Sequence, residues 1–274
     1  MDASSTSAIA TAVSLLPLTA VAFRPPAPEA GQPGPTFWMC MGLAAFAPAQ
    51  WTCVQMAGGW PTGLSSALTA TVAACLIAFA LLCALSPPAW RLARLLLPYL
   101  LCLSVLAVAA SLKNHGHFVG GLPLPWLDFH IVISVTTYAL VTLAAVAALA
   151  GTIQERALKT KRPNGFSRAL PAVAESEVLE IRLLRLSEAV LGAGLVSGMA
   201  LLYHETGALL RFDHKTLFSF AAFLVIGALL IARARSGVRG RAAARLALAA
   251  YLLLTLAYIG VKFVREILLS GTSV

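Results

Sequence analysis

Charged residues are scarce in this 274-residue sequence. Asp, Glu, Lys and Arg make up 11% of it, against 59% hydrophobic residues, and the mean hydropathy is +0.84. Soluble domains of ordinary composition are about 25% charged, because their surfaces must be hydrated. The low charge therefore excludes a water-soluble fold of this size and indicates that most of the apolar surface faces lipid.

The sequence also lacks the motifs of several chemistries. Its five cysteines lie inside apolar runs and form no Cys-x-x-Cys pair, which argues against a disulfide framework or covalently attached haem. No phosphate-binding glycine loop, paired-carboxylate site or Ser-His-Asp arrangement can be assembled from the remaining residues. Hydrolysis and phosphoryl transfer thus have no evident site, and we expect that the protein is not an enzyme.

Long apolar runs are what the sequence has instead. There are eight, most of them near or above the roughly 17–25 residues that a helix needs to cross the bilayer core. They cover residues 5–23, 37–56, 64–85, 92–112, 129–153, 189–203, 216–232 and 246–269. None alternates with a period of two, so helices rather than barrel strands satisfy their backbone hydrogen bonds. The sequence predicts an all-α, polytopic transmembrane helix bundle of about eight spans, in one membrane domain over residues 1–274.

One long hydrophilic stretch, residues 154–188, separates the fifth and sixth runs and holds most of the acidic side chains. We interpret it as a cytoplasmic loop. From Glu177 to Leu186 it alternates apolar and charged residues in a way that also permits a surface helix.

Lys and Arg residues separate clearly between the two sides of such a bundle. With the N-terminus outside, 15 of the 20 fall in or beside the inner segments, which leaves Lys113, Arg211, Lys215, Lys262 and Arg265 on the outer side. Cytoplasmic retention of basic loops favours this orientation. It also accounts for the net charge of +9 without a nucleic-acid partner. The Ala-, Leu- and Arg-rich composition favours a bacterial inner membrane.

Histidines carry the strongest functional signal. All five lie on the predicted outer side, where His130 opens the fifth span, His204 closes the sixth and His214 opens the seventh. An imidazole there can ligate haem iron, ligate another transition metal or relay protons. Haem fits well, because its macrocycle prefers apolar walls and its propionates prefer water and positive charge, which Lys113, Arg211 and Lys215 supply.

An interfacial histidine is also tolerated without any function. We prefer that interpretation for His115 and His117, which lie in a glycine-rich segment, and leave both interpretations open for His204. His130 and His214 stand at matched depth at the starts of two spans, so we favour them as ligands.

The helix that begins at His130 carries a family resemblance. His130, Ser134, Tyr138 and Ala139 form a His-x-x-x-Ser-x-x-x-Tyr-Ala pattern that resembles the cytochrome c assembly protein family, which includes the haem-handling CcsA and CcmC types. Three further segments are similar to its eight-span YpjD and HemX-like branch. They are residues 213–216, 237–241 and 256–264.

The resemblance implies a haem-binding protein that assists haem trafficking or cytochrome c assembly beside other maturation proteins. Haem b would be held non-covalently, with His130 and His214 as axial ligands of the iron. Two features depart from the family: residues 205–215 contain no tryptophan, where haem-delivery members have a tryptophan-rich loop, and the second span contains no histidine. The first departure argues against haem attachment to apocytochrome. The second argues against a transmembrane haem conduit.

Two other classes of function stay open. One is a cofactor-free membrane regulator of tetrapyrrole synthesis that acts through residues 154–188 on a soluble partner. The other is a small-molecule or ion transporter, although spans one to four carry no ionisable side chain at their centres.

Overall fold

The structure is a computed structural model that describes residues 3–24, 32–58, 63–113, 125–207, 209–211 and 213–264. In this part of the chain, eight helices are long and apolar enough to cross a membrane, and no strand is present, which confirms the predicted all-α membrane bundle. The elements are α1 (Ala3–Phe23), α2 (Pro35–Gly58), α3 (Leu64–Leu85), η1 (Pro87–Leu92), α4 (Ala93–Lys113), α5 (Pro125–Lys159), α6 (Gly165–Arg168), α7 (Val173–Thr206), α8 (His214–Ser236), α9 (Arg241–Thr255), η2 (Leu256–Gly260) and α10 (Val261–Phe263).

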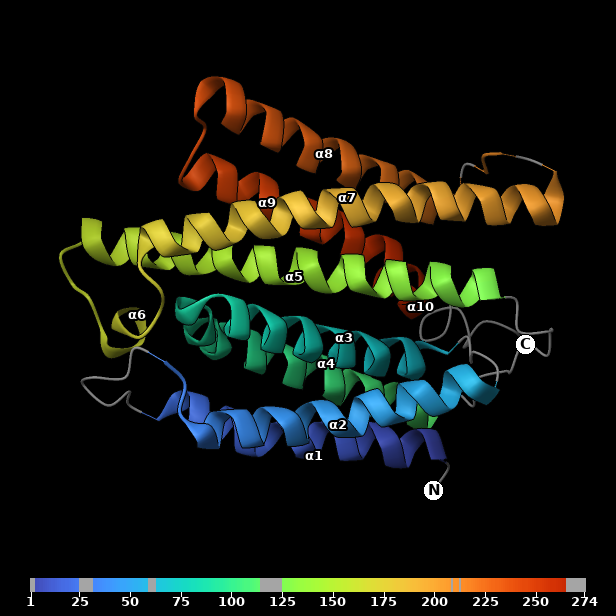
Figure 1. Cartoon of the computed structure of the whole chain (residues 1–274), viewed down its shortest axis with the longest axis horizontal. Helices are drawn as coiled ribbons and strands as arrows, with labels where there is room; N and C mark the ends of the chain where they lie inside the picture. Colours follow the sequence, from blue (N-terminus) through green and yellow to red (C-terminus); the bar gives the residue numbers. More distant parts are fainter. Residues whose placement is uncertain are drawn as a thin grey trace.

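The helices run back and forth across the molecule, as Figure 1 shows. One end of the bundle, here called the His130 end, holds the first residues of α1, α5 and α8 and the last residues of α7. The opposite end holds α6 and is called the α6 end. Helix α5 lies between α1–α4 on one side and α7–α10 on the other, and it contacts α3, α4, α7 and α9. It is therefore the shared wall of the two halves.

The hydrophilic stretch 154–188 is mostly helical. Helix α5 continues to Lys159, and α7 begins at Val173, so the amphipathic segment and the sixth apolar run form one helix. The first turns of α6 and α7 are both capped. The side chain of Asn164 accepts a hydrogen bond from the backbone N–H of Ser167, and Glu175 accepts one from the N–H of Ala172.

Ion pairs join the helices at the α6 end. Arg233 of α8 donates to Glu180 of α7 at 2.9 Å, and both side chains are nearly inaccessible. Glu177 accepts the backbone N–H of Gly240 at 3.2 Å, where α9 begins. A buried pair costs desolvation that its Coulomb attraction only partly offsets, so its main effect is to fix which helices meet.

Four of the chain's five tyrosines form a cluster between the two halves. The hydroxyl oxygens of Tyr99 (α4) and Tyr138 (α5) lie 2.8 Å apart, and that of Tyr138 lies 3.2 Å from the hydroxyl of Thr255 (α9). The rings of Tyr251 and Tyr258 pack against Tyr138 with centroids 6.1 and 5.7 Å away. Tyr138 therefore binds both halves of the bundle through one hydroxyl.

We expect Tyr138→Phe to destabilise the protein by roughly 0.5–1.5 kcal/mol, because it removes both hydrogen bonds and keeps the ring. Tyr203→Phe is the control, since the Tyr203 side chain is exposed. Unfolding in mixed detergent micelles measures the difference. Equal stability of the two variants would contradict the role given to the Tyr138 hydroxyl.

Candidate functional site

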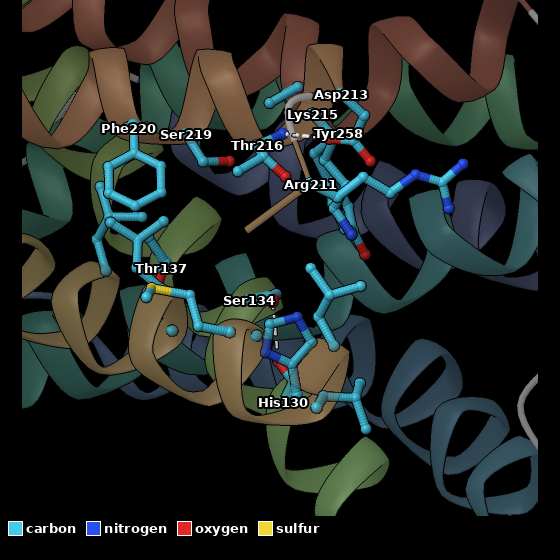
Figure 2. Close-up of a pocket in the computed structure, with 18 of the residues that line it drawn as sticks. His130, Ser134, Thr137, Arg211, Asp213, Lys215, Thr216, Ser219, Phe220 and Tyr258 are labelled. Carbon is cyan, nitrogen blue, oxygen red and sulfur yellow. Dashed lines mark hydrogen bonds between the residues drawn. The ribbon is translucent and has the colours of Figure 1, made fainter. Parts of the chain in front are cut away.

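A cavity of about 400 Å³ opens near the His130 end, between α5, α7, α8 and the last span. Most of its wall is apolar and comes from residues such as Leu127, Leu195 and Phe220. Figure 2 shows the polar groups that face it. They are His130, Ser134, Thr137, Arg211, Asp213, Lys215, Thr216, Ser219 and Tyr258. Apolar walls with few polar groups are typical of small-molecule and cofactor pockets.

The imidazole of His130 is seated against a glycine of α7. A methyl group added at Gly198 would lie 2.9 Å from the His130 Cε1 atom, closer than real Cβ atoms come to any neighbour. Because Gly198 has no side chain, the half-buried ring fits between the two helices and still lines the cavity.

Ser197, the preceding residue, forms a hydrogen bond with that ring. Its Oγ lies 2.8 Å from Nδ1 of His130, and its own proton is donated to the carbonyl of Gly194 at 3.0 Å. With the Ser197 proton donated to Gly194, the Ser197 oxygen is the acceptor for Nδ1, and the ring proton is then assigned to Nδ1. This leaves the lone pair on Nε2, the state in which a histidine ligates a metal while its other nitrogen donates to a neighbour.

Ser197 receives a second hydrogen bond from α5. The indole N–H of Trp126 donates to its backbone carbonyl at 3.3 Å, one helical turn before His130. Two side chains of α5 thus bind one residue of α7, which sets the register between the helices and the position of His130.

Basic residues stand on the rim opposite His130. Arg211 and Lys215 line the cavity with Asp213, whose carboxylate caps α8 by accepting the N–H of Thr216 at 2.8 Å. Partial burial would raise the pKa of the Asp213 carboxyl, but the hydrogen bonds from Thr216 and the charges of Lys215 and Arg211 outweigh it, so its pKa lies below the usual value. The rim keeps a net positive charge and suits an anionic group.

The other candidate histidines are placed differently. His204 and His214 are exposed and are not among the residues that line the cavity. His214 is nevertheless flanked by Asp213 and Lys215, which do line it. His115 and His117 lie outside the described residues. Among the described residues no three His, Cys, Asp or Glu side chains gather into a metal-binding group.

The sequence did not reveal that Gly198 and Tyr258 line the cavity, or that Ser197 holds His130 in place. A signal for Ser197 and Gly198 was present, because Gly194-Leu-Val-Ser-Gly198 is a Gly-x-x-x-Gly pattern, which marks close helix contacts in membranes. Tyr258 sits on the π-helical turn η2, a distortion that is frequent at functional sites but has no signature in one sequence.

These features define the class of the molecule: a multi-pass membrane protein whose helix ends enclose a histidine-containing cavity with a basic rim. The model of the cytochrome C assembly protein family matches residues 35–269, and the chain belongs to that family. It is similar, with 59% identity over 233 residues, to an "Uncharacterized 28.8 kDa protein in nifR3-like 5'region" of Azospirillum brasilense. That match covers 85% of this chain and 86% of the relative. No solved structure matches the chain significantly.

Gly198→Ala should destabilise the protein by roughly 1–3 kcal/mol and displace the His130 ring, because the added methyl overlaps Cε1. Gly42→Ala is the matched control: Gly42 is also within a helix, and an added methyl there meets no atom within 4 Å. We expect it to be neutral or to stabilise by up to about 1 kcal/mol. Unfolding in detergent, together with the rate at which diethyl pyrocarbonate modifies His130, measures both effects. A Gly198→Ala protein that matches Gly42→Ala would contradict the packing described.

Proposed function

We propose that the cavity binds haem through His130 and that the protein assists cytochrome c assembly or haem trafficking. The observation that carries the proposal is the Ser197 hydrogen bond, which leaves the Nε2 lone pair of His130 available beside the cavity.

The remaining residues fit haem as well. Its macrocycle would lie against the apolar wall, and its two carboxylates would pair with Arg211 and Lys215 on the rim. The volume of about 400 Å³ is within the range of pockets that hold cofactors. His130 would hold the iron of haem through Nε2, and bound haem would supply the chemistry of that iron.

His214 is the proposed second ligand. It is the first residue of α8 and adjoins Lys215 on the rim, so its approach to the cavity requires a rotation of its exposed side chain. Without that rotation the iron would keep an open position. The number of histidine ligands is therefore a direct test of this part of the proposal. We assign His204 no axial position, because it is exposed and does not line the cavity.

The family and the structure support the wider role. The family is that of cytochrome c assembly, and the described helices suit a multi-pass membrane protein. A relative with 59% identity is bacterial. We place the protein in the bacterial inner membrane with its N-terminus and the His130 end outside, the side on which the basic loops are fewest. It would act as an accessory haem-binding protein beside other maturation proteins, without a catalytic step of its own.

The absorption spectrum of the detergent-purified protein tests the haem site. We expect a Soret band and sharp reduced bands that His130→Ala abolishes. His214→Ala should keep the haem but convert a six-coordinate low-spin spectrum into a high-spin one, because one axial ligand is lost. His204→Ala is the matched control and should leave the spectrum unchanged. A protein that stays colourless after haem is added would refute the proposal.

Titration with haem tests the rim. Lys215→Gln should weaken haem binding by roughly 10- to 100-fold, because a charge-assisted hydrogen bond contributes roughly 1.5–3 kcal/mol. Lys161→Gln, at the α6 end, is the control and should bind haem as the unmodified protein does. If both variants bind equally well, the carboxylates of haem do not rest on Lys215.

A further inference from the structure

The contact between α7 and α8 consists of successive layers. In two of them a large side chain of one helix lies on a glycine of the other. Phe223 of α8 packs on Gly192 of α7, where an added Cβ would lie 3.3 Å from its ring. Closer to the α6 end, Glu188 of α7 packs on Gly227 of α8. The last layer is the Glu180–Arg233 ion pair. Two acidic residues of one helix therefore face α8 in different surroundings.

Glu188 forms no ion pair with any residue in the described part of the chain. Its Oε1 lies 2.9 Å from the position of a Cβ at Gly227, so the carboxyl group rests directly on the α8 backbone. Its Oε2 is buried and forms no hydrogen bond with any residue that the structure describes. Glu180, two turns away, receives the guanidinium of Arg233 at 2.9 Å. Glu180 and Glu188 thus differ, because only Glu180 is paired with a cation among the described residues.

The Glu188 carboxyl also lies inside the apolar zone. It is eight residues beyond Glu180, about 12 Å along the helix axis, and Gly227 is six residues, about 9 Å, from Arg233. Gly227 belongs to the apolar run 216–232 and lies within the stretch His214–Ser236 that is long and apolar enough to cross a membrane. One turn further along α8, Phe223 packs on Gly192 of α7.

A carboxylate in such a place is unfavourable, because no cation among the described residues pairs with its charge, whereas the neutral acid loses much less solvation. Ionisable groups at membrane depth are rare and are a sign of function. We infer that Glu188 is a proton-binding site inside the membrane, occupied by a proton at neutral pH, and that Gly227 provides its niche. Loss of that proton would put an uncompensated charge between α7 and α8, so the contact of the two helices depends on it. This inference does not rest on haem binding.

Infrared absorption of the purified full-length protein at neutral pH tests the inference, since a neutral carboxylic acid absorbs in a C=O band separate from carboxylate and amide bands. Glu188→Gln should remove one such acid band and leave the carboxylate bands unchanged. Glu175→Gln is the matched control on the same helix: its carboxylate caps α7, so its loss should reduce a carboxylate band only. Loss of carboxylate rather than acid absorption in Glu188→Gln would overturn the inference.

Gly227→Ala provides a second readout that keeps the acid in place. The added methyl would lie 2.9 Å from Oε1, so the carboxyl must move and its C=O band must shift in frequency. Gly42→Ala should leave the band where it is. An unshifted acid band in Gly227→Ala would show that the protonated group is not on Gly227 and would also overturn the inference.

Discussion

Helices α5 and α7 approach each other closely because small residues line their contact along its whole length. Ser176 of α7 packs on Gly151 of α5, Ile133 of α5 on Gly194 of α7, and His130 on Gly198, with an added Cβ 2.9–3.3 Å from its neighbour in each case. In lipid, apolar surface alone does not drive helices together, and close packing with interhelical hydrogen bonds does. The Ser197 hydrogen bonds to Trp126 and His130 form only at this separation. The position of the candidate ligand therefore follows from the packing of two helices.

The cavity is a consequence of the same contact. Helix α5 is the shared wall of the two halves, and α7 is fixed against it, so the space that remains lies between this pair, α8 and the last span. Tyr138 and Tyr258 line that space and belong to the tyrosine cluster, which joins α5 to α4 and to α9.

The sequence predicted the architecture well, because the bilayer demands a minimum length of apolar residues and each span satisfies its own backbone hydrogen bonds. Residues 173–188, for which the sequence permitted a surface helix, form one continuous helix, α7, with the sixth apolar run. His130 could be singled out from its motif and its depth. Ser197 and Gly198 could not be assigned to it, because one sequence does not give the rotation of α7 about its axis. The same uncertainty put His204 and His214 in the candidate set, although the structure leaves both side chains exposed.

An experimental structure of the protein with haem added tests the central claim most directly, because it locates the iron relative to the two nitrogens of His130. The account predicts that iron is bound to Nε2 while Nδ1 keeps its hydrogen bond to Ser197, with the haem carboxylates toward Arg211 and Lys215. Haem bound elsewhere, or His130 turned so that Nδ1 leaves Ser197, would contradict it.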